Sequence, residues 1–380
     1  MVDKKEENNC CGCRSCEQAC PQQAITMIEN EKGFRFPHIN YSLCTKCGLC
    51  DVVCGFTENY PNHGDAPQIY AVKNKDTNIR MTSTSGGIFV AISDYILDHS
   101  GVVYGVGYGT DLYVCHKRAE TKAERDEFKG SKYVQSDTLN TYTSAKKDLD
   151  SGRLVLYTGT PCQISGLKAF LRKDYEKLIT VDLLCHGTPS NKSWRDFLNV
   201  IEQDNHTKIV GAEFRNKSKG WHTPVTLLKS NDNLHRIKGS QSYFQLFNPN
   251  YMLMPACYNC KFKKYEKCSD ITIADFWGIE RSLPEIDDNK GVSLVLINSP
   301  KGTDIFEKVS KNLDIFVRGK EHCAEDQIIK MCEKNPKYDE FWENYQKHGM
   351  RYVMLKYTEY SSIRTFIKKA IRKIKRICKI

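Results

Sequence analysis

The sequence reads CCGCRSCEQACP at residues 10–21 and CTKCGLCDVVC at residues 44–54. Both stretches space their cysteines as C-x2-C-x2-C-x3-C, in which three thiolates bind one 4Fe-4S cluster and the fourth cysteine reaches a second cluster. Two such runs predict two clusters that exchange their fourth ligands. The first quartet is Cys10, Cys13, Cys16 and Cys54, and the second quartet is Cys20, Cys44, Cys47 and Cys50.

This pattern predicts a small N-terminal domain of the bacterial two-cluster ferredoxin type over residues 1–66. Two short β-like segments, at residues 25–28 and 34–36, lie between the cysteine runs and are able to close such a domain. A polar stretch with two prolines and a glycine follows at residues 59–68, which is typical of a domain boundary.

The main alternative for these cysteines is zinc. Zinc knuckles use two CxxC pairs with four ligands in all, often including histidine. Here eight cysteines form two quartets, and no histidine interrupts either run, so we expect iron–sulfur clusters. Two details depart from the pattern without removing a ligand. Cys11 is a surplus thiol, and Gly55 stands where the second run would have proline.

The composition indicates that a larger domain follows the clusters. With 380 residues, 40% of them hydrophobic, the chain is long enough for a further domain of conventional size. Its 18 cysteines would indicate disulfides in a small secreted protein, but the first nine residues are charged and lack an apolar signal segment. We therefore expect a reducing, cytoplasmic location. No stretch approaches the roughly 18–20 apolar residues of a membrane-spanning helix.

The net charge of +10 is concentrated near the end of the sequence. Residues 361–380 contain eight lysines and arginines and no acidic residue, so the rest of the chain is nearly neutral. This distribution argues against a nucleic-acid partner. Aliphatic residues alternate with the cations at helical spacing, which is typical of a helix that lies on an anionic membrane. Our hypothesis is a peripheral contact at the inner membrane face. A terminal helix packed on its own domain and an RNA-binding arm are the alternatives.

Residues 67–150 and 151–330 are predicted to form the two parts of a mixed α/β domain, with a helical tail at residues 331–380. In the first part, Ser83-Thr84-Ser85-Gly86-Gly87 precedes a helical pattern that starts at residue 88. Free backbone N–H groups at a helix start bind phosphate, so this loop is a candidate site for a nucleotide cofactor. An ordinary N-cap and turn is the alternative.

The second part opens with a βαβ pattern, in which strands at residues 154–157 and 178–184 flank a helix at residues 164–171. The loops that leave the two strands carry Cys162 and Cys185. Both are expected at the carboxyl edge of the sheet, where open α/β proteins bind ligands. Four thiolates are enough for a further 4Fe-4S cluster. The third quartet is Cys162, Cys185, Cys257 and Cys260.

Other interpretations of the third quartet remain open. The same four thiolates suit structural zinc, a redox-active CxxC pair or buried inert cysteines. Cys268 is either a spare thiol or a replacement for one of the four. The remaining isolated cysteines are interpreted as structural, and they are Cys115, Cys323, Cys332 and Cys378.

Six motifs, in order along residues 5–320, together resemble one family, the beta subunits of coenzyme F-420 hydrogenases and dehydrogenases in the form with an N-terminal two-cluster ferredoxin. They are SxSGG at 83–87, GSKYVQS at 130–136, GTPCQ at 159–163, CHG at 185–187, CYNC at 257–260 and SDITIADFWG at 269–278. The resemblance implies a cytoplasmic flavoprotein that binds FAD and moves electrons between iron–sulfur clusters and an organic substrate. It also implies that the third quartet binds a cluster near the flavin. Similar proteins also occur among bacterial polysaccharide-biosynthesis genes.

We therefore expect an iron–sulfur, flavin-dependent oxidoreductase of mixed α+β and α/β class, with a ferredoxin domain followed by a mixed α/β flavin-binding domain. A redox partner protein, either a ferredoxin or a dehydrogenase subunit, would deliver electrons through the clusters to FAD. The small-molecule substrate would be of the coenzyme F-420 type or a glycan or lipid-linked precursor. The alternatives are a non-catalytic electron-transfer subunit of a larger redox complex and a zinc-bound scaffold at the membrane surface.

Several residues of this second domain are candidates for the site. His186 is a candidate proton donor because the reference pKa of histidine is about 6.5. Lys132 and Arg215 are candidate catalytic contacts to an anion, for which a solvated lysine and an exposed polar hairpin are the alternatives. The predicted cofactor-binding residues are Ser83, Ser85, Gly86, Gly87, Lys132 and Asp275.

Overall fold

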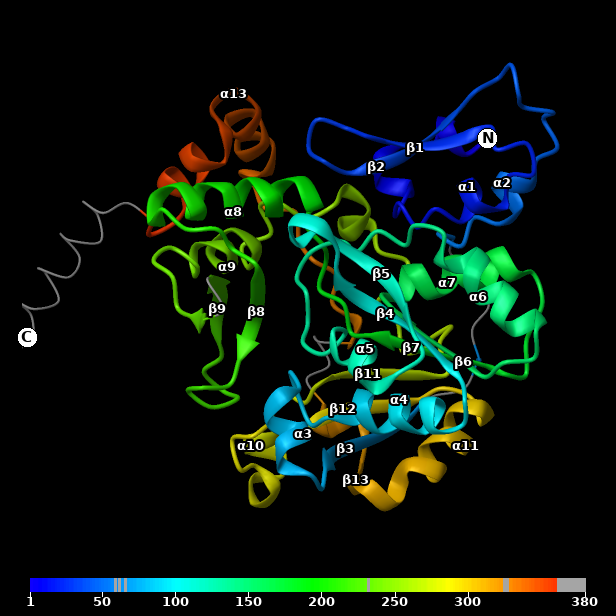
Figure 1. Ribbon diagram of the computed structural model, residues 1–380, viewed down its shortest axis with the longest axis vertical. Coiled ribbons are helices and arrows are strands. Elements are labelled where there is room, and N and C mark those ends of the chain that lie inside the picture. The colour runs from blue at the N-terminus through cyan, green and yellow to red at the C-terminus, as the bar shows by residue number, and fades with distance from the viewer. Residues whose placement is uncertain (58–59, 61–62, 65–66, 231–232, 324–327, 361–380) are drawn as a thin grey trace, which may run out of the picture.

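The computed structural model describes residues 1–57, 60, 63–64, 67–230, 233–323 and 328–360. The tail at residues 361–380, on which the membrane-surface hypothesis rests, lies outside the described residues. Within the described part of the chain, no helix is long and apolar enough to span a bilayer. Figure 1 shows an N-terminal domain, a large central sheet with helices on both faces, and a smaller lobe beside them.

The N-terminal domain is built around its cysteines. Strand β1 (Ile25–Glu29) pairs with β2 (Arg35–Ile39) in an antiparallel hairpin, close to the segments expected from the sequence. Each cysteine run makes a single helical turn, α1 (Ser15–Ala19) and α2 (Leu49–Val52). Val2, Ile25 and Ile39 form a small apolar cluster, and cysteines of both quartets pack against it. Because so small a core supplies little stabilisation, a domain of this size depends on the groups that its cysteines bind.

The central sheet has eight strands in the order β13-β3-β12-β11-β7-β6-β4-β5. Its four middle strands, β11, β7, β6 and β4, are parallel, and the outer strands pair antiparallel. The strands are β3 (Gln68–Asn74), β4 (Val102–Tyr108), β5 (Val114–Ala119), β6 (Val155–Gly159), β7 (Leu178–Leu183), β11 (Ile271–Asp275), β12 (Ser293–Ile297) and β13 (Leu313–Arg318). The mixed α/β class predicted for this part of the chain is confirmed.

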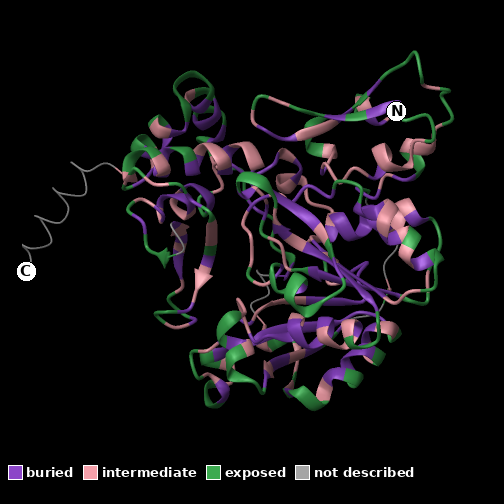
Figure 2. Ribbon diagram, viewed as in Figure 1, coloured by how far each residue is buried: buried purple, intermediate pink, exposed green. Residues whose placement is uncertain are grey.

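Helices cover both faces of this sheet, and most residues of the middle strands are buried, as Figure 2 shows. Helices α4 (Ile88–Asp98) and α11 (Pro300–Val309) pack on one face, where Val103, Leu156 and Val295 belong to one apolar cluster. Helices α6 (Thr141–Asp150) and α7 (Pro161–Leu171) cover the other face. Strands that are buried on both faces consist of continuous β-branched and aliphatic residues, and the middle strands of this sheet fit that pattern.

The smaller lobe combines a three-stranded antiparallel sheet with helices. Its strands are β8 (Gly211–Asn216), β9 (Val225–Ser230) and β10 (Asn233–His235), and its helices are α8 (Asn191–Asn205), α9 (Ser242–Phe247) and α13 (Tyr338–Tyr357), the last broken at Gly349. The short helices α3 (Thr77–Thr82), α5 (Lys122–Asp126) and α10 (Ile279–Ser282) lie in the connections of the large domain. Trp194 and Trp342 are fully buried and anchor the lobe to the rest of the core.

One helix begins earlier than the sequence pattern predicts. Helix α7 starts at Pro161 rather than at residue 164, so Cys162 lies in its first turn and not in a loop. Proline suits the first helical position, and Thr160 with Gln163 forms a capping box around it. This signal is readable in the sequence, because a threonine three residues before a glutamine at a helix start is a capping pattern.

Candidate functional site

The first quartet comes together as the exchange of fourth ligands requires. Burial raises the pKa of Cys10 to about 12, and the neighbouring thiolates of Cys13 and Cys54 raise it further. Burial also raises the pKa of Cys16, and there the contributing neighbours are Cys13, Cys10 and Cys54. The four thiols therefore surround one small volume, although Cys54 belongs to the second run of the sequence.

The second quartet gathers on the outer side of the same domain. Cys20, Cys44, Cys47 and Cys50 line one small hollow with Pro21 and Gly48. Cys47 is exposed, so this hollow lies nearest to solvent and is the part of the domain that a redox partner reaches most easily.

The third quartet meets at the carboxyl edge of the central sheet. Burial raises the pKa of Cys185, and its thiolate neighbours are Cys257, Cys162 and Cys260. Cys162 comes from α7, Cys185 from the segment after β7, and Cys257 from a short 3-10 helix, η4 (Pro255–Asn259). The carboxyl edge of the sheet, where the βαβ pattern places Cys162 and Cys185, is therefore where these thiols are neighbours.

The donor set of each quartet is four thiolates, which is the set that a 4Fe-4S cluster takes and that structural zinc also accepts. Four thiolates that each lie about 2.3 Å from one zinc ion must be within about 4 Å of each other. Among the described residues, no three His, Cys, Asp or Glu side chains are grouped closely enough to hold one ion. A 4Fe-4S cluster is larger and takes four thiolates at its corners, which fits the donor set of all three quartets.

A cavity of about 810 Å³ connects the third quartet with the other predicted site residues. The ends of β6, β7 and β11 contribute Gly159, Leu183 and Asp275 to its wall. The predicted residues that line it are Cys162, Cys185, Cys257, Cys260, Ser83, Ser85, Gly87, Lys132, His186, Arg215 and Asp275, whereas Gly86 is not part of the lining. Residues from all six motifs thus line one cavity.

Arg215 carries the clearest anion-binding feature of the cavity. Its side chain is 9% exposed, and Nη1 donates to Asp275 Oδ2 at 2.7 Å. The guanidinium lies 4.6 Å from the centre of the Trp277 ring, which stacks in turn on Trp221. Its Nε and Nη2 atoms are buried and have no hydrogen-bond partner among the described residues. Because leaving such donors unpaired costs free energy, they favour an anionic ligand in the cavity.

Asp275 orients this arginine. Oδ2 accepts from Arg215, and Oδ1 accepts from Trp221 Nε1 at 2.8 Å. Because Trp221 is fully buried, the alternative of an exposed hairpin for this stretch is wrong. No sequence signal indicates the stacked pair, because Trp221 and Trp277 are 56 residues apart.

The loop at residues 83–87 is fixed by its own polar atoms. Ser83 Oγ donates to Ile79 O, Ser85 Oγ donates to Val292 O, and Gly86 N donates to Ser293 Oγ. The expectation that Gly86 offers a free N–H group is therefore wrong. This group donates to Ser293 where the loop lies against the sheet. Helix α4 nevertheless starts at the cavity with Gly87 as its N-cap and without a side-chain cap.

Lys217 also holds this loop, although no sequence motif singled it out. Its buried Nζ donates to the carbonyl oxygens of Arg80, Ser85 and Lys290 at 2.7–2.8 Å. The three acceptors belong to helix α3, to the loop itself and to the segment before β12. Lys217 therefore positions the loop without contacting the cavity itself.

Lys132 reaches the cavity with only part of its donor capacity in use. Its Nζ donates to the carbonyl oxygens of Glu127 and Lys129, both at 2.9 Å. An ammonium group has three hydrogens, so one remains for a ligand. Burial lowers the pKa of Lys132 to about 7.

We expect inorganic pyrophosphate to bind this cavity with a pH dependence that involves Lys132. Above pH 7 the amine is largely neutral and must take up a proton when an anion binds, so its contribution weakens by up to about tenfold per pH unit. Calorimetric titration between pH 6 and pH 9 measures this slope. Lys132→Met should reduce it, whereas Lys129→Met, a change at another lysine of the lining, should leave it unchanged. Equal slopes in wild type and Lys132→Met would contradict the assignment.

His186 lies in the cavity wall and pairs through Nε2 with Asn250 Oδ1 at 2.7 Å. Desolvation lowers its pKa, so the neutral ring, with hydrogen on Nε2, is favoured. Cys332 donates to the His186 carbonyl oxygen and also lines the cavity beside Cys257. This position is compatible with the structural role predicted for it from the sequence. Cys268, by contrast, is buried and is not part of the cavity lining. Its thiol donates to Pro161 O in the first turn of α7.

Two family models match the chain. Residues 152–321 match the model for the C-terminal part of the beta subunit of coenzyme F420 hydrogenase/dehydrogenase. This part of the chain is therefore similar to the C-terminal part of those beta subunits. Residues 9–57 match the 4Fe-4S dicluster domain. The resemblance drawn from the motifs is confirmed, and the chain is an iron–sulfur electron-transfer protein related to these beta subunits.

A solved structure is also similar to this chain. It is a chain of the F420-reducing [NiFe] hydrogenase complex from Methanosarcina barkeri, with 17% sequence identity and a TM-score of 0.46. The alignment covers 76% of the present chain and 90% of the other. No curated protein matches the sequence significantly.

Proposed function

We propose that this protein is an iron–sulfur flavoprotein oxidoreductase. Electrons enter at the second quartet, pass through the first and third quartets, and reach FAD bound in the cavity, where an organic substrate is reduced or oxidised. The family name denotes a subunit, which supports a partner subunit or a ferredoxin as the electron donor. The observation that carries the proposal is that one cavity is lined both by the four thiols of the third quartet and by Arg215, Lys132 and the start of α4.

The residues present fit such a cofactor. The cavity volume of about 810 Å³ lies within the range of cofactor sites in proteins. The unused donors of Arg215, the start of α4 and Lys132 suit a pyrophosphate group. A flavin would supply the conversion between the single electrons of clusters and two-electron chemistry on an organic molecule. The protein's part is to orient Arg215 through Asp275 and to place His186 in the wall of the cavity.

The test is the flavin content of protein purified without oxygen. We expect about one FAD per chain and its reduction by a low-potential donor. Arg215→Leu removes a buried, hydrogen-bonded charge and should weaken FAD binding by about 30-fold or more. Arg281→Leu is the matched control, because Arg281 is 81% exposed and lies outside the cavity lining.

A non-catalytic electron-transfer subunit is the second candidate function, because the matched family is named for a subunit. It predicts iron without flavin and no reduction of a two-electron acceptor. That result in the wild-type protein would favour it over the enzyme.

A further inference from the structure

The amine of Lys217 lies in a cage of three backbone oxygens. The residue is 4% exposed, and its Nζ donates to Arg80 O at 2.8 Å and to Ser85 O and Lys290 O at 2.7 Å. An ammonium group has three hydrogens, so these three bonds use its whole donor capacity. Within the described part of the chain, no hydrogen bond or ion pair joins this ammonium to a carboxylate. The cage therefore holds a buried cation with neutral oxygens alone.

The three oxygens of the cage come from three separate segments. Arg80 belongs to α3, Ser85 to the loop at residues 83–87, and Lys290 to the segment before β12. Lys217 itself follows strand β8 of the smaller lobe. A single ammonium group thus joins the lobe to the loop that lines the cavity and to two neighbouring segments of the large domain.

The walls of the cage are also held by contacts that do not involve the lysine side chain. Arg80 Nη1 donates to Asp288 Oδ2 at 2.8 Å, and Arg80 Nη2 donates to Gly291 O at 2.9 Å. Gly291 has φ +104°, and a Cβ atom there would lie 2.7 Å from both Lys217 Nζ and Ser85 O. Only glycine therefore leaves room for the ammonium group at this point. Because Arg80 ties α3 to residues 288–291, these walls stay together when the lysine side chain is removed.

Carbonyl oxygens that converge on one point repel one another unless a cation lies between them, and proteins coordinate calcium and potassium ions with such oxygens. We infer that the three carbonyl groups form a cation site that the Lys217 ammonium fills, and that the filled site holds the loop at residues 83–87 in its anion-binding shape. Lys217 is thus a positioning residue. This inference rests on the proposed function, since the anion is the pyrophosphate part of the cofactor.

The position of Lys217 in the chain connects it to both sides of the anion site. Ser85 and Gly87 of the loop line the cavity. Arg215, whose unused donors face the same cavity, lies two positions before Lys217. Loss of the cation leaves three carbonyl dipoles facing one another. The loop and the segment that carries Arg215 then lose their common attachment, and the anion site loosens.

The experiment replaces the lysine amine by a free cation in the full-length protein. Lys217→Ala keeps the three carbonyl groups and leaves space for an ammonium ion. Thermal unfolding and calorimetric titration with inorganic pyrophosphate are compared in ammonium chloride and in tetramethylammonium chloride at equal ionic strength. Tetramethylammonium has no N–H group and is too large for the cage. Both measurements are made at pH 6, because burial lowers the pKa of Lys217 to about 7 and the wild-type amine must carry its charge.

In tetramethylammonium chloride, we expect Lys217→Ala to unfold at a lower temperature than wild type. It should bind pyrophosphate about 10–100-fold more weakly, the range found when a supporting group is removed from a metal site. Ammonium chloride should raise the unfolding temperature of the variant and restore most of the lost affinity, because the ion binds only the folded cage. Lys219→Ala is the matched control, since Lys219 is exposed in the same turn and lies outside the cavity lining. It should match wild type in both salts.

The outcomes separate this inference from the proposed function. Equal behaviour of Lys217→Ala in the two salts would overturn the inference, because the side chain would then act by packing alone. If the variant does not fold in tetramethylammonium chloride, recovery of folding in ammonium chloride supports the cation site, and failure in both salts contradicts it. Wild type that binds no pyrophosphate would contradict the cofactor site of the proposed function, while the unfolding temperatures of Lys217→Ala still decide whether the cage binds a cation.

Discussion

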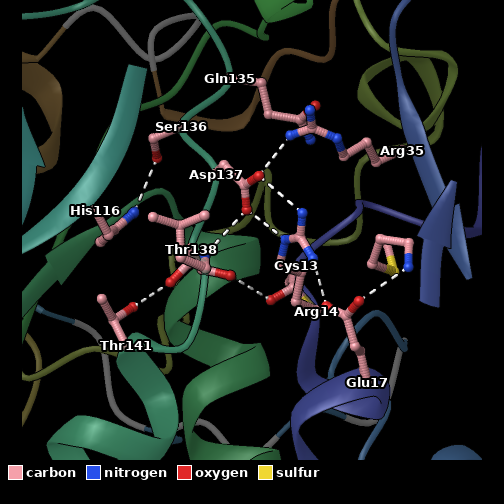
Figure 3. A network of polar contacts seen from close by, with 12 residues as sticks. Cys13, Arg14, Glu17, Arg35, His116, Gln135, Ser136, Asp137, Thr138 and Thr141 are labelled. Atoms are coloured by element: carbon pink, nitrogen blue, oxygen red, sulfur yellow. Dashed lines mark hydrogen bonds and ion pairs between the residues drawn. The ribbon is translucent and has the colours of Figure 1, made fainter. Parts of the chain in front are cut away.

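Replacing Asp137 by alanine is expected to lower the free energy of unfolding by about 3–5 kcal/mol and to loosen the N-terminal domain from the central sheet. The Asp137 side chain is 4% exposed and lies between Arg14 and Arg35, both from the N-terminal domain. Arg14 Nη2 donates to Asp137 Oδ2 at 2.8 Å, and Tyr113 Oη donates to the same oxygen at 2.6 Å. Figure 3 shows the two guanidinium groups converging on this one carboxylate.

The expected loss is large because the variant removes the buried carboxylate that two cations share, and Arg14 and Arg35 then keep only their contacts to Glu17 and Glu29. Urea unfolding followed by circular dichroism measures the change, and limited proteolysis reports whether the N-terminal domain separates first. Asp98→Ala is the matched control, since Asp98 pairs with Lys122 at 2.8 Å while both side chains are at least half exposed. Such a pair contributes about 0–1 kcal/mol. Similar losses in both variants would show that Asp137 does not join the domains.

Replacing Gly86 by alanine is expected to destabilise the protein by about 3 kcal/mol and to disrupt the anion-binding end of the cavity. A Cβ atom there would lie 2.2 Å from Val72 O and 2.6 Å from Ser293 N. Both are backbone atoms of neighbouring strands, which cannot rotate away as a side chain does. The loop at residues 83–87 must therefore move, and the start of α4 moves with it.

Thermal unfolding and pyrophosphate binding together measure this effect. Gly109→Ala is the control, because Gly109 has negative φ and its nearest neighbour, Cys115 Sγ, is at an ordinary 3.5 Å. We expect the control to bind pyrophosphate like wild type. Normal stability and binding in Gly86→Ala would mean that the loop is not held against the sheet as described.

The parts of the site that the sequence could predict are those with local signals. The spacing of the first two cysteine runs specifies both the ligand type and the exchange between quartets. The third quartet follows from topology, because loops after parallel strands share one edge. The predicted start of α7 is three residues late, since apolar periodicity begins only at Ile164 while the capping box lies before it.

The parts that could not be predicted depend on how distant segments pack. Cys13 and Gly166 come from different domains, and nothing near either residue in the sequence indicates that helix α7 packs on this cysteine. The same holds for Asp137, which reads as one solvated acid and becomes the contact between two domains. Arg215 was a candidate, but its two unused donors are visible only once Asp275 and Trp277 are in place.

The central claim is that one chain carries electrons from paired clusters, through a third thiol quartet, into the cavity. The most direct measurement is the iron and zinc content of oxygen-free wild type, Cys162→Ser, Cys16→Ser and Cys115→Ala. We predict about twelve iron atoms per chain in wild type and Cys115→Ala, and about eight in each of the other two variants, since each loses one four-iron cluster. Equal iron content in wild type and Cys162→Ser, or zinc in place of iron, would contradict the account.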